Sequence, residues 1–157
     1  MLRLSKRADY ALMAMKHLAA REPDRAASTR EIAQAYDIPV ELLAKVLQRL
    51  ARAGLLTSQQ GIHGGYQLSR PAASVSIAQV IEAIDGPLRM TACSEGDESC
   101  DQYSRCNVRD PLWRIKNRIV STLSESSIAD LADEVGAMPA PLAVHVRSKR
   151  ESLAIES

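Results

Sequence analysis

Two helix patterns separated by a tight turn, and followed at once by a glycine-rich hairpin pattern, constrain the fold of this chain most. In ASTREIAQAY, Ser28 stands three residues before Glu31, a capping box that predicts a short helix ending near residues 36–37. In DIPVELLAKVLQRLARAG, Pro39 suits the first position of a second helix and Gly54 suits its C-terminal cap. Two short helices joined by a turn of a few residues match helix-turn-helix geometry.

The second of these helices has one apolar and one polar face. The predicted buried face carries Leu42, Leu43, Val46, Leu47 and Leu50. The opposite face carries Glu41, Ala44, Lys45, Gln48 and Arg52, which recur at helical spacing. Because a helix that contacts DNA in the major groove needs a polar, cationic face, this segment is the predicted recognition helix.

The next stretch, LLTSQQGIHGGYQLSR (55–70), has strand-like ends around Gly61, Gly64 and Gly65. This pattern predicts a β-hairpin with a flexible tip. A helix-turn-helix followed by a hairpin is a winged helix, whose wing lies on the flanking DNA backbone or minor groove. The alternative is a small helical domain whose hairpin has no binding role. The order of the elements and the basic face favour DNA binding.

Further helices are predicted on both sides of this unit. The first runs from about Ser5, a plausible N-cap, to Ala20, with Leu12, Met15, Leu18 and Ala19 on its buried stripe. Another occupies SIAQVIEAIDGPL (76–88), where Ser76 and Gln79 form a capping box, and a short last helix occupies residues 127–136.

A longer helix is predicted over residues 110–126, with Asp110 as its N-cap and Pro111 in its first turn. Its apolar stripe consists of Leu112, Ile115, Ile119, Val120 and Leu123. Since this stripe lies far in sequence from the winged helix, we expect it to form a homodimer seam; packing on its own domain is the alternative.

The prediction is a mainly α chain, a winged helix-turn-helix with a long C-terminal dimerisation helix. Four parts are expected: a DNA-binding domain (1–90), a cysteine loop (91–109), the dimerisation helix with the short final helix (110–136) and a disordered tail (137–157).

The length of the chain suggests one domain with an appendage, or one small domain that pairs with a copy of itself. The chain has 157 residues, 46% hydrophobic and only 3% aromatic with no Phe, so its core must be aliphatic. Residues 1–60 carry ten Lys/Arg and six Asp/Glu, whereas residues 93–110 carry two and five. A basic N-terminal part is suited to a polyanion such as DNA.

No apolar run of 18 residues and no signal-peptide pattern is present, so we expect a cytoplasmic protein that does not enter a membrane.

Three cysteines in CSEGDESCDQYSRC (93–106) are the only cysteines in the chain, with spacing C-x6-C-x5-C. The loop is too polar to hold itself together by burial. Three thiolates at one soft metal centre could order it, although both zinc and iron–sulfur sites usually need a fourth ligand. A thiol redox switch and three incidental surface cysteines are the alternatives. The acidic character of the loop argues against reactive bare cysteines.

The chain resembles the IscR/NsrR-type family of bacterial iron–sulfur transcription regulators in four stretches. These are SKRADYALMAM, IPVELLAKVLQRLARAGLL, GIHGGYQLSRP and the three cysteines that follow VIEAIDGPL. The resemblance covers about residues 1–135 and is specific, because the stretches occur together and in order. MLRLSK and CNVRDPLWRIKNRI…SIADLA look most like the branch that regulates the Suf cluster-assembly genes.

The resemblance implies a homodimer with a 2Fe–2S or 4Fe–4S cluster in the cysteine loop, whose state sets DNA affinity. Of the two, 2Fe–2S is the favoured form. Cys93, Cys100 and Cys106 match the three ligands. The first gap is six residues here, whereas five is the common form. The His found three residues after the last cysteine in IscR-like members is Arg109 here, which has no lone pair to donate.

The resemblance also suggests a fourth ligand. Nitric-oxide-sensing members use an acidic residue from the first helix of the partner subunit, and Asp9 matches that position. A solvated first-turn Asp favoured by the helix dipole is the alternative. Asp110, Asn107 and His63 follow as candidates.

The chain is therefore interpreted as a transcription regulator, a repressor rather than an activator, that binds a double-stranded operator. Its DNA contacts are expected at the start of the first short helix, on the recognition helix and in the wing: Ser28, Thr29, Glu41, Lys45, Gln48, Arg49, Gln59, Gln60, His63, Gly64 and Tyr66. A cluster-free thiol switch and a cluster carrier that does not bind DNA are the rivals. No nucleophile–base constellation is evident, so an enzyme is not expected.

Overall fold

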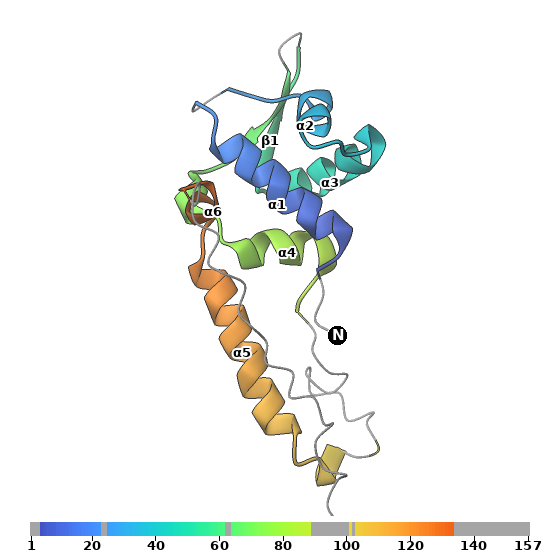
Figure 1. The fold of residues 1–157 in the computed structure, drawn as a ribbon, viewed down its shortest axis with the longest axis vertical. Coiled ribbons are helices and arrows are strands. Elements are labelled where there is room, and N and C mark those ends of the chain that lie inside the picture. The colour runs from blue at the N-terminus through green and yellow to red at the C-terminus, as the bar shows by residue number, and fades with distance from the viewer. Residues whose placement is uncertain (1–3, 23–24, 62–63, 89–100, 102, 134–157) are drawn as a thin grey trace, which may run out of the picture.

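The computed structural model describes residues 4–22, 25–61, 64–88, 101 and 103–133. Within these ranges the elements follow one another in this order: α1 (Lys6–Ala19), α2 (Thr29–Ala35), α3 (Val40–Arg52), β1 (Leu56–Gln59), β2 (Gly65–Leu68), the 3-10 turn η1 (Ala72–Ser74), α4 (Ile77–Asp85), the 3-10 turn η3 (Tyr103–Arg105), α5 (Arg109–Glu125) and α6 (Ile128–Asp133). Figure 1 shows α1 to α4, the two strands and α6 gathered in one unit, from which α5 extends away. The predicted mainly α winged-helix fold is confirmed.

Helix α1 begins as its sequence predicts. The Ser5 side chain accepts a hydrogen bond from the backbone nitrogen of Ala8 (3.1 Å), and Ser5 in turn donates to the carboxylate of Asp85 at the end of α4. The predicted Met15 and Leu18 are buried, whereas Leu12 and Ala19 are half-buried. The helix also buries Ala8, Ala11 and Ala14, which the predicted stripe did not include.

The helix-turn-helix is confirmed, with two corrections to its caps. The Ser28 hydroxyl accepts from the backbone nitrogen of Glu31 (3.1 Å), but the Glu31 side chain pairs with Arg21, so only half of the predicted capping box forms. Pro39 is the N-cap of α3 and not its first helical residue. Asp37 has a positive φ of 52°, which an Asp side chain tolerates, and this allows the tight turn between α2 and α3.

The predicted wing is present as an antiparallel hairpin, in which Leu56 pairs with Leu68 and Gln59 with Gly65. The wing also joins the chain just before α2, because Ala27 and Tyr66 exchange backbone hydrogen bonds of 2.9 and 2.8 Å. A Cβ on Gly65 would lie only 2.2 Å from the carbonyl oxygen of Ala27. Glycine is therefore required here by the close approach of two backbones.

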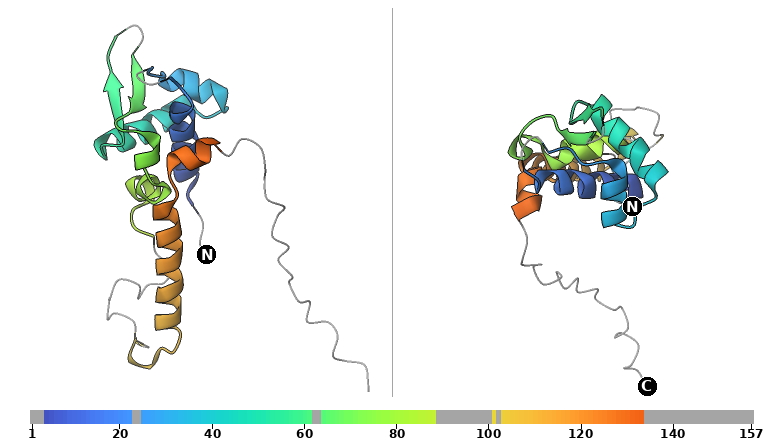
Figure 2. Two further views of the ribbon diagram at one scale, coloured as in Figure 1. Left: turned by 90° about the vertical axis from the view of Figure 1, so that its left-hand side faces the viewer. Right: turned by 90° about the horizontal axis from the view of Figure 1, so that it is seen from above.

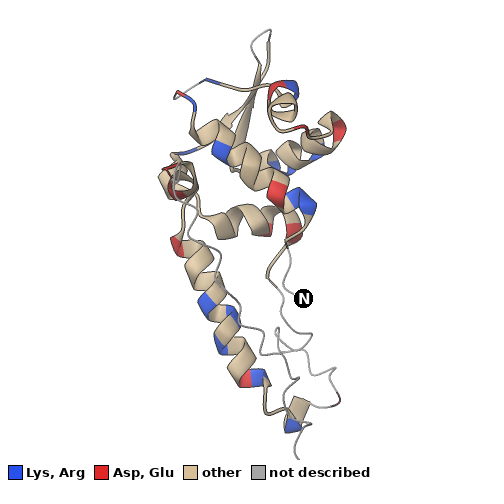
Figure 3. Ribbon diagram, viewed as in Figure 1, with Lys and Arg blue, Asp and Glu red and all other residues tan. Residues whose placement is uncertain are grey.

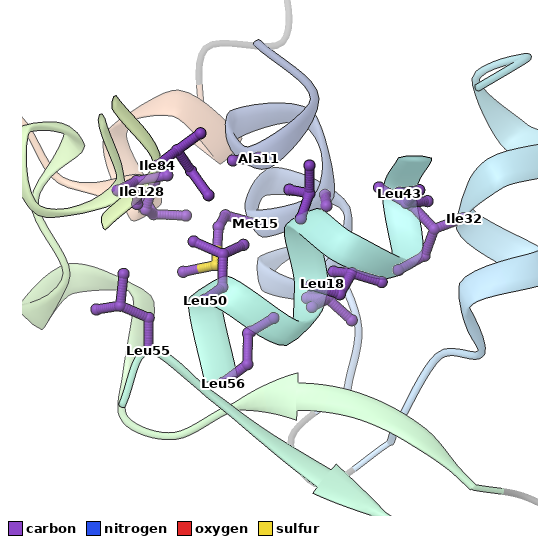
Figure 4. Close-up of a cluster of buried hydrophobic side chains, with 14 of the residues drawn as sticks. Ala11, Met15, Leu18, Ile32, Leu43, Leu50, Leu55, Leu56, Ile84 and Ile128 are labelled. Atoms are coloured by element: carbon purple, nitrogen blue, oxygen red, sulfur yellow. The ribbon is translucent and has the colours of Figure 1, made fainter. Parts of the chain in front are cut away.

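The core is aliphatic and is built mainly by α1, α3 and α4, as the close-up in Figure 4 shows. Leu43, Val46, Leu47 and Leu50 of α3 are buried as predicted, and Leu42 is half-buried. Helix α4 has the predicted capping box between Ser76 and Gln79.

The chain returns to this core after α5. Ile128 of α6 is fully buried, and its backbone nitrogen donates to the carbonyl oxygen of Val75 (2.8 Å). Helix α6 packs against α1 and η1. The sequence pattern predicted a short helix here but not that it completes the core of the winged-helix unit.

Helix α5 differs from the other long helices. It begins at Arg109 after the N-cap Val108, so the prediction that Asp110 is the N-cap was wrong; Asp110 lies in the first turn. No residue of α5 is buried, and Trp113 and Ile115 remain 53% and 47% exposed. The left view of Figure 2 also shows α5 extending away from the rest of the described structure. None of the helices within the described ranges has the length and apolarity needed to cross a membrane.

Candidate nucleic-acid interface and cysteine segment

The polar face of α3 is exposed as the sequence predicts. Glu41, Lys45, Gln48 and Arg49 all lie at the surface. Arg49 differs from its neighbours because its Nη1 donates to the carbonyl oxygen of Ile84 (2.9 Å), which ties α3 to the end of α4. Figure 3 shows acidic residues at the start of α3 and basic residues further along it. The helix thus combines carboxylate, amide and cationic groups that could contact base edges and phosphates.

Helix α2 is held against α1 by a polar cluster that sequence reasoning missed. Arg21 forms an ion pair with Glu31 and donates to His17 Nε2 (3.4 Å), while His17 Nδ1 lies 3.2 Å from the Tyr36 hydroxyl. Burial and the adjacent Arg21 cation lower the pKa of His17. The hydrogen bond from Arg21 lowers the pKa of Glu31. The cluster spans 20 residues of sequence, so no local pattern could have revealed it.

The candidate DNA-contacting residues at the start of α2 and in the wing differ in exposure. Ser28 and Thr29 are half-buried, and the Ser28 hydroxyl is already used as a cap. Gln59 and Gln60 are exposed, and Gln59 Nε2 donates to Gln67 across the hairpin (2.9 Å). In the second half of the wing, Gly64 and Tyr66 are half-buried, while His63 lies outside the described residues.

Only one of the three candidate cluster ligands in the cysteine loop is described. Cys106 is a free, half-buried thiol just after η3, whereas Cys93 and Cys100 lie outside the described residues. The predicted tail (137–157) lies outside them as well.

Arg109, which stands where IscR-like members have a His, fixes the turn that precedes Cys106. Its guanidinium lies 4.5 Å from the centre of the Tyr103 ring and donates to the Tyr103 carbonyl oxygen (3.2 Å) and to Asp110 (2.8 Å). The bond to Asp110 raises the pKa of Arg109 and lowers the pKa of Asp110. Arg109 therefore joins η3 to the start of α5, while Asp110 is engaged with a cation and Asn107 is exposed.

Asp9 lies in the first turn of α1 and is exposed. Figures 1 and 2 both show the length of α5 between η3 and the unit that contains α1. The structure therefore does not bring Asp9 and Cys106 of one chain together.

Comparison with known protein sequences identifies regulators. A family profile, Rrf2, described as "Iron-dependent Transcriptional regulator", matches residues 4–134. A Mycobacterium tuberculosis protein, provisionally named as an HTH-type transcriptional regulator, is 34% identical over 139 residues, which are 88% of this chain and 84% of that protein.

Solved structures of regulators have a fold similar to that of this chain. CymR of B. subtilis, described as the global cysteine regulator, has a TM-score of 0.71 and 26% identity, covering 84% of this chain and 97% of CymR. The oxidised form of Staphylococcus aureus CymR has a TM-score of 0.69 and 26% identity, covering 86% of this chain and 99% of that one. IscR of T. potens shares the fold, with a TM-score of 0.65 and 24% identity over 83% of this chain and 85% of that one.

Proposed function

Because the chain belongs to the Rrf2 family of transcriptional regulators, we propose that it is a homodimeric repressor whose affinity for a double-stranded operator is set by an iron–sulfur cluster. Transcription regulation, as opposed to catalysis, follows from the family and from the M. tuberculosis relative. Beyond transcription regulation, we propose that the protein senses a cluster, acts as a repressor and controls iron–sulfur assembly genes. The signal would be cluster status, redox change or nitric oxide.

The observation that carries the DNA-binding part is the exposed polar face of α3 beside the wing. Lys45 and Gln48 are the residues we assign to base edges, because they lie one turn apart on the exposed face of the recognition helix. The two glutamines of the wing, Gln59 and Gln60, would meet the flanking backbone. We assign the other candidate DNA contacts, at the start of α2 and around Tyr66, to the same proposed surface.

The dimer is supported by the exposure of α5. Its apolar stripe runs along a 17-residue helix in which no side chain is buried, and Ile115 is 47% exposed. The other four residues of the stripe are half-buried, so apolar area remains exposed along the helix and favours pairing with another apolar surface. Two copies of the same helix supply that surface at a two-fold axis, which also suits a two-fold operator.

The proposed iron–sulfur cluster is supported by the three cysteines of the loop and by the position of Cys106. Three cysteine thiolates suit an iron–sulfur cluster, and Cys93, Cys100 and Cys106 would hold it. Asp9 of the partner subunit is the proposed fourth ligand, since within one chain Asp9 lies far from η3. When bound, a cluster of this kind supplies a redox-sensitive centre at the loop, and 2Fe–2S is the form proposed.

The chain's own contacts suggest how the loop could influence α3. Arg109 joins the turn before Cys106 to the start of α5, and α5 packs on α4. Helix α4 is tied to α3 by the bond from Arg49 to the carbonyl of Ile84. An ordered loop would thus favour one placement of α5, and with it one spacing of the two recognition helices in a dimer.

A cluster-free thiol switch is the second candidate. It is favoured by the likeness to CymR, including the oxidised form of the S. aureus protein, and by the half-buried free thiol of Cys106. Such a switch would form disulfides with oxidant and would contain no iron. A cluster carrier that does not bind DNA is less favoured, because it needs neither α3 nor the wing.

The deciding experiment is a UV–visible spectrum of protein purified without oxygen, with iron and sulfide counted per chain. Visible thiolate–iron bands with about two irons per chain would support the 2Fe–2S proposal, and four would change the cluster type. A protein that remains colourless after reconstitution would overturn it in favour of the thiol switch.

Two variants separate the two halves of the proposal. Cys100→Ala should lose its iron and remain a folded dimer. Lys45→Ala should keep its iron and bind a duplex selected from a random-sequence library more weakly. Full iron content in Cys100→Ala would show that the ligand assignment is wrong.

A further inference from the structure

A surface cavity of about 290 Å³ lies where α3 meets the N-terminal end of α1 and the end of α4. Its polar lining consists of Arg7 from α1 and Lys45, Gln48, Arg49 and Arg52 from α3, and its apolar lining consists of Val46 and Ile84. The α3 residues recur at intervals of three and four, so the cavity follows one side of the recognition helix over two turns.

The charge of this cavity is unbalanced. Four of its residues are cations, and none is acidic. In the part of the chain that the structure describes, the side chains of Arg7, Lys45 and Arg52 take part in no ion pair or hydrogen bond, and that of Arg49 bonds a neutral carbonyl oxygen. The nearest carboxylate in sequence to Ile84, that of Asp85, accepts hydrogen bonds from Ser5. Four cations in a lining that contains no acidic residue favour the binding of an anion.

We propose that this cavity binds a backbone phosphate of the operator, with Arg7 and Arg52 as the phosphate ligands. The inference rests on the proposed DNA binding and extends it to residues outside the recognition surface assigned above. Guanidinium groups match the geometry of phosphate oxygens and can donate two parallel hydrogen bonds.

A duplex phosphate fits this cavity better than a free anion because of where the cavity lies. Lys45 and Gln48 line it and also face the bases in the proposed docking, so a duplex on α3 must bring its backbone close to the cavity. Arg7 comes from a different helix, so a phosphate held between Arg7 and Arg52 would fix the tilt of α3 in the groove. Phosphate contacts of this kind set the register of a protein on DNA and carry no sequence preference.

The test is the salt dependence of binding to the selected duplex, measured for the wild type, Arg7→Gln and Arg52→Gln. Each variant should lower the magnitude of the slope of log K against log [salt] by about one and weaken binding to selected and random duplexes by a similar factor. Lys16→Gln, which removes a cation at the opposite end of α1, is the matched control and should leave the slope unchanged. Far-UV circular dichroism verifies that the variants are folded.

Three other results would overturn the proposal, and each points elsewhere. Unchanged slopes for both Arg variants, with intact wild-type binding, would exclude a phosphate contact at the cavity and leave the proposed function standing. A wild-type chain that binds no duplex at all would remove the proposed function itself. Inorganic phosphate that raises the melting temperature of the wild type but not of Arg7→Gln, together with unchanged DNA slopes, would identify a site for a free anion.

Discussion

The winged-helix unit and α5 are both built from amphipathic helices, yet their apolar stripes are buried to different degrees. Leu47 and Leu50 on α3 are fully buried, whereas no residue of α5 is buried and Ile115 remains 47% exposed. The difference lies in what surrounds each helix: α3 packs against α1, α2 and α4, whereas α5 packs mainly against α4. A helical pattern thus predicts that a stripe will be covered, but not by which surface. The described residues of one protomer leave the stripe of α5 only partly covered, and the proposed dimer would supply the remaining surface.

The largest effect is expected in the core of the winged-helix unit. Leu50→Ala should lower the free energy of unfolding by about 2–5 kcal/mol, since it leaves a cavity among fully buried aliphatic side chains. Urea unfolding followed by circular dichroism measures this change. Val40→Ala, at a position of α3 that is 44% exposed, is the control and should cost less than about 1 kcal/mol. Equal losses in both variants would contradict the burial assigned to α3.

A charge placed on the apolar stripe of α5 tests whether this stripe forms the dimer contact. Ile115→Asp should raise the dimer dissociation constant by about 100-fold or more, because two carboxylates would be placed at a symmetric apolar contact. Sedimentation at several protein concentrations measures the constant, and Asn117→Asp, at an exposed position on the opposite face of the same helix, tests the effect of charge alone. The circular dichroism of the winged-helix unit should be unchanged. A dimer that survives Ile115→Asp would show that α5 is not the seam.

A smaller effect is expected at the junction between the wing and the helix-turn-helix. Gly65→Ala should destabilise the chain by about 1–3 kcal/mol, because the added Cβ would meet the carbonyl of Ala27 at 2.2 Å. The backbone bonds between Ala27 and Tyr66 should weaken, which hydrogen exchange at those amides measures. Gln67→Ala, two residues further along the strand, is the control. Protected amides at both positions in Gly65→Ala would show that the two backbones can separate at little cost.

Local patterns predicted the elements of this fold because their signals are local. The Ser5 cap, the Ser76–Gln79 capping box and the four buried residues of α3 each depend on neighbours within one or two turns of helix. The caps that were wrong show the limit of such signals. Glu31 was expected to bond the Ser28 backbone, but Arg21, ten residues earlier, provides a charged partner that the side chain takes instead.

Contacts between distant segments could not be predicted in this way. Ile128 enters the core more than a hundred residues after Met15, and nothing in its own pattern distinguishes burial in this core from burial elsewhere. The same holds for the candidate site: the exposed face of α3 was predicted residue by residue, but the approach of Arg7 to Arg52 depends on how α1 crosses α3. The position of Cys106 beside Arg109 was predictable from sequence, whereas the clamp that Arg109 forms on Tyr103 was not.

The smallest predicted effect is a pH dependence in the cluster that holds α2 on α1. Burial and the Arg21 cation lower the pKa of His17, so the folded chain binds a proton less readily than the unfolded chain, whose His titrates near 6.5. Above pH 6.5 the imidazole is neutral in both states and its contribution to stability is complete. As the pH falls below 6.5 the unfolded chain takes up the proton first, so stability decreases until the lowered pKa of the folded state has been passed. The loss should stay below about 1 kcal/mol, since His17 is only half-buried.

Urea unfolding at pH 7.5, 6.5 and 5.5 tests this for the wild type and for His17→Gln, which cannot titrate in this range. The other two histidines, His63 and His145, are present in both proteins and cancel in the comparison. Glu31, whose pKa is lowered by Arg21, stays ionised across the whole window and keeps the ion pair intact. The wild type should therefore lose more stability than His17→Gln on acidification. Parallel pH profiles of the wild type and His17→Gln would contradict this prediction. They would mean that the contacts of His17 with Tyr36 and Arg21 hold α2 equally well whether His17 is neutral or protonated. The attachment of α2 would then be as insensitive to pH as the aliphatic core.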